Sequence, residues 1–540
     1  MTVLLAALIL ILFSLVIDLH HHLSGTRLPR VLAAAVLGIS WLLVGLGRLD
    51  PNQILLSLSW GGELPDLVVA LDFRGWAFSQ AAVTIALVQS VQNTWSASRL
   101  AGAVRLSGVT LLAGLAGSVF TLLLVWVILD LLWYSSNLAN SNWSVARSPT
   151  YLPALIFAAG PLILLLLSLF LAGNQGTWSS FPGRYSTALI AAGVFRLGIF
   201  DPSHHLFTDR LPSSWKTWTA RLSPRVMALL LIARGADTGG ELSLPGLIPG
   251  LAVGLILIAL LAFLSPGKKK LPSFWTLGLI GLAVISGLQS EGGHSQTWGT
   301  VLLLGGTLLV QQESPGRPSL VYQVGILLLF FGLPFTLLWG QLTSGAGDLT
   351  GWLTALAAGL LTGRAVLQAR LDFQTQADFQ SGADFQTEPA DRAEMTFEPD
   401  PGQDRTAAAP LVHGAGPVDP AALLSGALLV LSAYWINGSS SWWRASLAFW
   451  KQPLQVWLIP FCSGVSFLGA RYLTELPRVL ANLPGAAADL GRISGRGVER
   501  LLQLTAVIHR RILGLLEGRG GLVWAFLGAF LMLTLLLGGG

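Results

Sequence analysis

Charged residues are scarce in this chain. Aspartate, glutamate, lysine and arginine make up 11% of its 540 residues, whereas soluble domains carry about 25%. Hydrophobic residues make up 53%, and apolar runs recur that match a hydrocarbon core of about 30 Å, which takes about 20 helical residues. Backbone groups in lipid must be satisfied within their own segment, so continuous apolar runs indicate helices. The sequence therefore predicts an α-helical membrane protein.

Cysteine is almost absent, since Cys462 is the only one. A single cysteine excludes an intramolecular disulfide and any thiolate-held metal or iron–sulfur cluster within the chain. The sequence also shows no phosphate-binding loop, nucleophile elbow or paired-carboxylate active site. We therefore expect no cofactor and no catalytic centre in this chain, and any electron transfer would take place in other subunits.

An excess of charge of either sign is also missing. The formal net charge is +5, spread over the predicted loops, and the densest basic spot is "GKKK" at 267–270. Scattered lysine and arginine suit the cytoplasmic loops of a membrane protein. They do not indicate a nucleic-acid partner.

The apolar runs predict an all-α polytopic membrane protein with about 14 to 16 transmembrane helices. The first run lacks the basic region and small-residue cleavage site of a signal peptide, so we expect it to be retained. Two short runs, 186–200 and 222–234, are flanked by proline and polar residues, which is typical of broken helices. The candidate spans are 2–18, 31–47, 76–92, 106–119, 120–137, 153–172, 186–200, 222–234, 248–264, 272–288, 298–312, 321–340, 349–367, 421–436, 453–470 and 521–537.

Two stretches depart from the apolar pattern. Between residues 370 and 410 there are nine acidic residues against three arginines and a near-repeat, "TQADFQ" then "SGADFQ". Such sequence cannot bury enough apolar surface to fold, so it predicts a disordered linker, with a docking role as the alternative. From about 490 to 515 an apolar stripe runs beside five arginines. That pattern predicts an amphipathic helix lying along the membrane or along other helices.

Two ionisable residues lie inside otherwise apolar segments. Asp130 is near the middle of "FTLLLVWVILDLLWYSSNL", and Arg196 lies within "YSTALIAAGVFRLGIFDPSHH". A carboxylate at the bilayer centre costs about 2.5–3.5 kcal/mol, so it should face a partner or water and not lipid. An Asp130–Arg196 ion pair is the simplest solution. The alternatives are a pair that serves packing alone, or an Arg196 side chain that snorkels to the interface.

His204 and His205 follow Pro202, where the short helix of Arg196 should break. Histidine suits a proton relay because its unperturbed pKa is about 6.5. The competing interpretation is a pair of ordinary loop histidines. Metal ligation is less favoured, because no third ligand has suitable spacing.

The order of these segments resembles the antiporter-like membrane subunits of respiratory complex I, of group 4 membrane-bound hydrogenases and of Mrp antiporters. Three motifs occur in sequence, namely "LLVWVILDLLWYSS", "ALIAAGVFRLGIFDPSHHLFTDRLP" and "LSPRVMALLLIARG". Three further stretches are similar to the family's segments, namely "LDFRGWAFSQAAVTIALVQS", "LLLFFGLPFTLLWGQLTSG" and "LLEGRGGLVWAFLGAF". Each motif is degenerate, but together they follow the family's order over most of the chain.

The resemblance assigns an ion-pathway role to four residues. Asp130 stands where the family has its channel glutamate, Arg196 where it has the paired lysine, and His204 or His205 near the histidine of the helix break. The departures are informative. Met227 stands where the family usually has a lysine, and Trp339 and Gln341 where its later half usually has another. A partly buried lysine can release its proton, but an arginine cannot.

The resemblance also implies a division of the chain and a role. The divisions are 1–105 (N-terminal transmembrane helices), 106–240 (first antiporter-like half), 241–370 (degenerate second half), 371–415 (acidic linker), 416–476 (C-terminal transmembrane helices), 477–520 (lateral amphipathic helix) and 521–540 (last transmembrane helix). The implied role is a non-catalytic membrane-arm subunit of a complex I-like assembly, of the NADH/quinone or hydrogenase type.

Three alternatives for function follow. The chain is a subunit with reduced proton translocation, a scaffold of the same fold without conduction, or an unrelated polytopic transporter or lipid-linked transferase. The first two imply a multi-pass protein of the inner (plasma) membrane, surrounded by lipid and other membrane subunits of a respiratory complex. Quinone and redox centres would then lie in neighbouring subunits.

Overall fold

The computed structural model describes slightly less than half of the chain. The described residues are 1–24, 30–49, 53–58, 66–92, 97–140, 151–172, 177–197, 218–238, 247–264, 278–285, 349–364 and 420–437, with single positions at 288, 367, 458, 461, 462 and 465. Every structural statement below refers to these residues.

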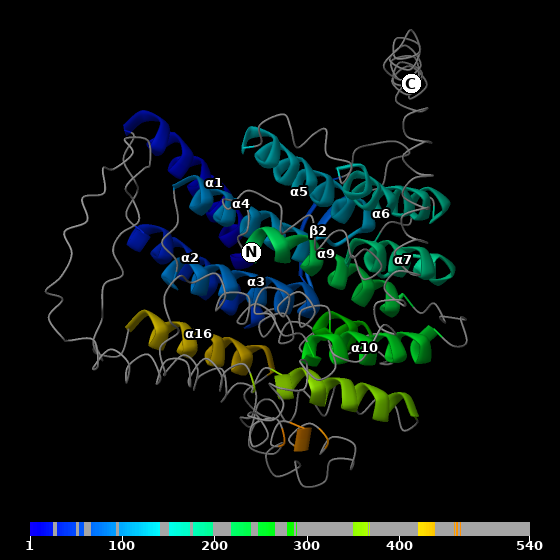
Figure 1. Ribbon diagram of the computed structural model, residues 1–540. Coiled ribbons are helices and arrows are strands. Elements are labelled where there is room, and N and C mark those ends of the chain that lie inside the picture. The colour runs from blue at the N-terminus through cyan, green and yellow to red at the C-terminus, as the bar shows by residue number, and fades with distance from the viewer. Residues whose placement is uncertain are drawn as a thin grey trace, which may run out of the picture.

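Helices dominate the described part of the chain (Figure 1). They are α1 (Thr2–Ser24), α2 (Arg30–Leu46), α3 (Phe73–Gln92), α4 (Ala97–Gly114), α5 (Val119–Asn140), α6 (Tyr151–Ala172), α7 (Ser186–Leu197), α9 (Trp218–Asp237), α10 (Leu247–Leu264) and α16 (Pro420–Asn437). Two short 3-10 turns, η1 (Gly47–Leu49) and η2 (Gly183–Tyr185), follow α2 and precede α7. Residues 278–285 and 349–364 are also helical.

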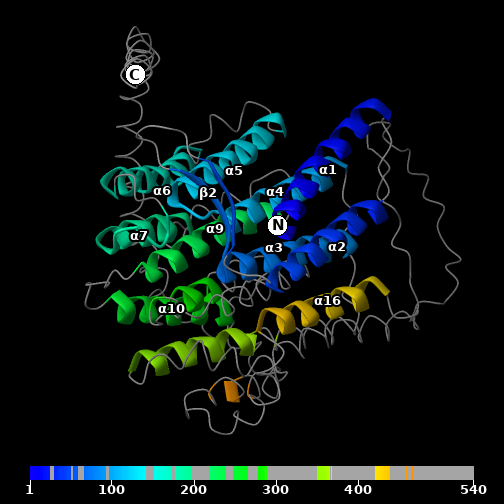
Figure 2. The ribbon, with the colours of Figure 1, turned by 180° about the vertical axis from the view of Figure 1, so that it is seen from behind.

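The helices pack side by side, with α5, α6 and α7 at one side of the bundle and α2 and α16 at the other (Figures 1 and 2). Helix α9 lies between α7 and α3, and α4 packs against α1, α3, α5 and α9. Helices α4 and α9 thus connect α5 and α7 to α1 and α3.

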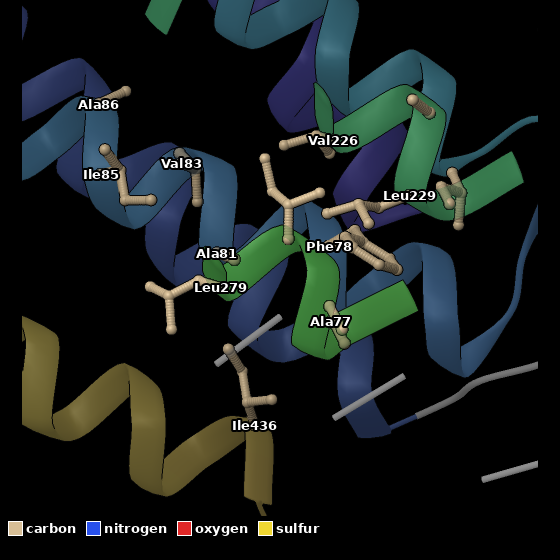
Figure 3. Close-up of a cluster of buried hydrophobic side chains, with 14 of the residues drawn as sticks. Ala77, Phe78, Ala81, Val83, Ile85, Ala86, Val226, Leu229, Leu279 and Ile436 are labelled. Carbon is tan, nitrogen blue, oxygen red and sulfur yellow. The ribbon is translucent and has the colours of Figure 1, made fainter. Parts of the chain in front are cut away.

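Helix α3 is the central element of this bundle. Every residue from Gly75 to Ser90 is buried, because α2, α4, α9 and α16 all pack against it. Figure 3 shows one side of this packing, where Phe78 of α3 lies near Leu229 of α9, and Leu279 and Ile436 approach from distant parts of the sequence. A helix enclosed on all sides can carry polar residues that never meet lipid.

The outer helices instead present leucine stripes. On α1, five leucines spaced three or four residues apart are exposed, namely Leu5, Leu8, Leu12, Leu15 and Leu19. Helices α1 and α2 also contain the two stretches in the described residues that are long and apolar enough to cross a membrane, Thr2–His20 and Val31–Leu49. Exposed apolar stripes of this length are expected on a bundle whose solvent is lipid.

A β-hairpin departs from the all-α prediction. Strand β1 (Gln53–Leu58) pairs antiparallel with β2 (Leu67–Leu71), with a bulge between Ile54 and Leu56. Strand β2 also bonds to the α4–α5 connection, since the Ala70 amide donates to the Leu115 carbonyl at 2.8 Å. The strand therefore fixes the start of α3 against the end of α4.

The predicted spans agree with the observed helices, with two corrections. Helix α4 begins at Ala97, nine residues before the predicted start at 106, because its enclosed first turns need no lipid-facing apolar surface. Helix α9 is a continuous helix of 20 residues, so the short helix predicted at 222–234 is wrong.

Several predictions lie outside the described residues. They are the spans 298–312, 321–340 and 521–537, the acidic linker 371–415, the lateral helix 477–520, the break at Pro202 and both histidines, His204 and His205.

Candidate functional site

The predicted ion pair between α5 and α7 is present. Arg196 donates from Nη1 to Oδ2 of Asp130 at 3.1 Å, and from Nη2 to Oδ1, so the guanidinium engages both carboxylate oxygens. The side chains are 8% exposed for Arg196 and 11% for Asp130. Because a bidentate arginine–carboxylate pair fixes geometry as well as charge, the two helices are held in one register.

The surroundings of the pair are apolar. Trp126 lies one turn before Asp130 on α5, and the Arg196 guanidinium carbon is 5.0 Å from the centre of its ring. Leu122 and Leu129 of α5 and Leu231 of α9 belong to the same buried cluster. An ion pair in such a setting is screened very little by salt.

The local sequence explains how the pair forms. Leu122, Trp126 and Leu129 recur at helical spacing and bury the face of α5 on which Asp130 lies. Arg196 stands in the last turn of α7, where a cation interacts favourably with the helix dipole. Gly193, one turn earlier, lies directly against Ala228 and Ile232 of α9, so α7 and α9 approach closely.

The geometry limits what this pair can do chemically. Both carboxylate oxygens accept hydrogen bonds from a side chain that stays protonated. The guanidinium therefore occupies one acceptor position on each oxygen of the Asp130 carboxylate. The structure thus confirms the predicted contact, whereas the ion-pathway role of Asp130, Arg196, His204 and His205 stays a prediction.

Met227 and Arg364 have the burial expected for bundle interiors. Met227 is fully buried in the cluster beside α5, so the position where the family usually has a lysine is apolar here. Arg364, in the helical stretch 349–364, is buried as well. Among the described residues, no three histidine, cysteine or carboxylate side chains come together as metal ligands.

A second buried arginine was not singled out by sequence reasoning. Arg234 of α9 is 3% exposed and donates to both carboxylate oxygens of Asp72, at 3.2 and 3.0 Å. It also donates to the carbonyls of Gly114, at 3.0 Å, and Ala116. These carbonyls end α4, and the last carbonyls of a helix lack partners within it. Arg234 therefore caps α4 and joins it to α3 and α9.

Neighbouring contacts reinforce this cap. Arg234 stacks on Trp178 at 5.1 Å, and the Trp178 indole donates to the Ala116 carbonyl at 2.7 Å. One step away, Arg74 pairs with Asp237 and donates to the Ala233 carbonyl at 2.6 Å. The signal in the sequence was a pair of matched motifs. "LDFRG" at the start of α3 and "ARGAD" at the end of α9 each contain one aspartate and one arginine.

A fourth ion pair joins α1 and α4. Arg105 bonds to Asp18 and lies 3.3 Å from the Ser14 hydroxyl. The predicted boundary at 106 had left Arg105 just outside a span, but the structure places it in the middle of α4. Asp18 is 43% exposed, so this pair is the most accessible of the four described pairs.

No protein-family model and no curated protein matches the sequence of this chain. Its structure is similar to a chain of respiratory complex I from Thermus thermophilus, with 17% identity and a TM-score of 0.58, over 85% of this chain and 99% of that one. It is also similar to a chain of the Mrp complex from Dietzia sp., with 15% identity and a TM-score of 0.57, over 98% of this chain and 63% of that one.

The chain has the antiporter-like membrane-subunit fold. The resemblance inferred from the degenerate motifs is thereby confirmed at the level of fold. A third similar structure, the membrane-bound sulfane sulfur reductase, an archaeal respiratory membrane complex, has 11% identity and a TM-score of 0.42 over 88% of this chain and 96% of that one, too low to carry an argument. An unrelated transporter fold is disfavoured, because the antiporter-like fold accounts for nearly the whole chain.

Proposed function

We propose that this chain is a non-catalytic membrane-arm subunit of a complex I-like respiratory assembly, in which proton translocation is reduced or lost and scaffolding is the main role. The observation that carries the proposal is the Asp130–Arg196 pair within an antiporter-like fold. The fold supports membership in a multisubunit membrane complex. The pair supports loss of conduction, because its cation cannot exchange protons.

The second half of the chain adds to this argument. Its predicted spans, from 248 to 367, contain no lysine, and Arg364 is their only lysine, arginine or carboxylate side chain. A proton moving there would find no titratable side chain near the membrane centre, a barrier of about several kcal/mol. We therefore expect little or no proton flux through the second half.

The proposal implies which partner subunits the protein has and in which membrane it lies. The chain would lie as a multi-pass protein in the inner (plasma) membrane, against lipid and other membrane subunits. Quinone and redox centres would belong to neighbouring subunits, of the NADH dehydrogenase or hydrogenase type. Purification of the tagged chain under native conditions tests this assignment. Membrane subunits and iron–sulfur subunits should be recovered with it, whereas recovery of the chain alone would contradict the proposal.

The loss of conduction is tested by Asp130→Asn, which keeps the side-chain shape and removes the charge. We expect the amount of assembled complex to fall, while the proton-to-electron ratio of the complex that does assemble stays unchanged. Asp18→Asn is the matched control, because it removes the same charge from the more exposed pair. Full assembly with the loss of a whole proton per turnover would show a working pump.

A further inference from the structure

A buried polar cluster lies where α2, α3 and α16 meet, at the opposite side of the bundle from α5 and α7 (Figures 1 and 2). The Trp41 indole donates at 2.9 Å to the hydroxyls of both Thr84 and Ser432. The two hydroxyls are 2.9 Å apart, and Thr84 donates to the Gln80 carbonyl at 2.6 Å. All three side chains are buried, and each makes at least two hydrogen bonds within this cluster.

Gln80 is the exception in this cluster. It lies one turn before Thr84 and one turn after Trp76, whose indole donates to the Val44 carbonyl of α2 at 2.7 Å. The three residues form one stripe of α3, with Trp76 against α2 and Thr84 against both α2 and α16. The Gln80 side chain is fully buried, and neither its Oε1 nor its Nε2 has a protein partner.

A carboxamide in this position needs a ligand. It offers two donors and two acceptor lone pairs, and burying it with none of them bonded is unfavourable. Surrounding helices and lipid cannot relieve that cost as bulk solvent would. Internal water commonly does so, with about three hydrogen bonds per molecule to buried polar groups.

The chemistry of the cluster selects water over an ion. A cation would suit Oε1, but it would be repelled by the amide hydrogens of Nε2. The hydroxyls of Thr84 and Ser432 already accept from Trp41, so they are poor metal ligands here. An anion would leave Oε1 without a donor. Water both donates and accepts, and so it satisfies both ends of the amide.

We propose that the junction of α2, α3 and α16 holds at least one internal water molecule bound to the Gln80 carboxamide. This hydrated site is separate from the Asp130–Arg196 pair and does not depend on the proposed function. The enclosed helix α3 would then be hydrated on the side that packs against α2 and α16. Its side toward α9 is apolar, and Phe78 lies there in the apolar cluster (Figure 3).

X-ray hydroxyl-radical labelling of the native complex tests the proposal, because radicals form from the bound water itself. Trp41 should be labelled severalfold faster than Phe78, after correction for intrinsic reactivity, although both side chains are buried. A cryo-EM map that resolves ordered water should also show density bonded to the Gln80 amide. Equal labelling of Trp41 and Phe78, or an amide without such density, would overturn the proposal.

Two variants sharpen the test. Gln80→Leu removes the carboxamide at nearly constant volume, and it should lower Trp41 labelling to the rate of Phe78. Ser79→Ala is the matched control, because Ser79 is the adjacent buried residue of α3 and its hydroxyl lies against Gly114 of α4. It should leave Trp41 labelling unchanged. If Gln80→Leu does not assemble, the unmodified complex still decides the question.

Discussion

Two aspartate–arginine pairs of this bundle use the same chemical groups in different surroundings. In the Asp130–Arg196 pair both side chains are buried, and the guanidinium donates hydrogen bonds to the two carboxylate oxygens. In the Asp72–Arg234 pair the arginine is buried, but Asp72 is 37% exposed and two helix-end carbonyls share the guanidinium.

The difference separates two uses of a buried arginine. Arg234 has backbone acceptors that never change their charge, so its position is fixed by the helix end of α4 whatever the state of Asp72. Arg196 has one charged acceptor, so its position and that of Asp130 depend on each other. The first arrangement is a structural cap, and the second is a pair in which either partner alone is unstable.

The largest effect is expected from Arg196→Ala. The substitution leaves the Asp130 carboxylate buried without a partner, which costs about 3–5 kcal/mol. Arg196→Lys keeps the charge but loses the bidentate contact and the stacking on Trp126, so it should be less damaging. The measurement is the yield and thermal stability of the assembled complex.

A double variant checks the mechanism of that loss. Asp130→Ala combined with Arg196→Ala removes both charges and should be more stable than Arg196→Ala alone. Additive losses in the double variant would mean that the two side chains are not coupled.

The next effect concerns Arg234→Met, which keeps much of the side-chain volume. It leaves the Gly114 carbonyl without the Arg234 donor, at about 1–3 kcal/mol for a buried group, whereas the Ala116 carbonyl loses Arg234 but keeps the Trp178 indole. Asp72→Asn should cost less, because Arg234 keeps both carbonyls and Asp72 is partly exposed. Thermal unfolding of the purified complex compares the two variants. Equal losses would show that the carboxylate, and not the carbonyl cap, holds Arg234.

The sequence predicted the first pair and missed the second for a physical reason. Asp130 interrupts a long apolar run, so its need for a cation is visible, and Arg196 was the candidate in a nearby span. Asp72 and Arg234 stand at helix ends, where charges are ordinary. Only the packing of α3, α4 and α9 shows that Arg234 is buried.

The fold was predictable where helices face lipid and less so where protein encloses them. The leucine-rich α1 was predicted over most of its length, whereas the first half of α4, which contains Arg99, Arg105 and small residues, was missed. The hairpin was also missed, although its two β-rich runs flank the turn residues Gly61, Gly62 and Pro65. The histidines after Pro202 remain a prediction.

A moderate effect is expected from Gly193→Ala. An added Cβ would meet Ile232 and the Ala228 carbonyl of α9 at less than van der Waals distance, and overpacking of this kind costs about 1–3 kcal/mol. Because Arg196 lies one turn further along α7, separation of α7 from α9 should also strain the ion pair. Thermal stability measures the loss, and Gly250→Ala on α10, where a Cβ meets no atom, is the control.

The smallest effect is expected from Asp18→Asn, which tests whether exposure alone separates the Asp18–Arg105 pair from the Asp130–Arg196 pair. Asp18 and Arg105 are 43% and 22% exposed, and Arg105 keeps the Ser14 hydroxyl as a second contact. Exposed pairs contribute about 0–1 kcal/mol, so the stability of the complex should change little. A loss as large as that of Asp130→Asn would mean that the exposed side of Asp18 is covered by a partner subunit or hydrocarbon in the assembly. Measuring both variants in detergent and in lipid nanodiscs separates these causes, because only hydrocarbon contact depends on the surrounding bilayer.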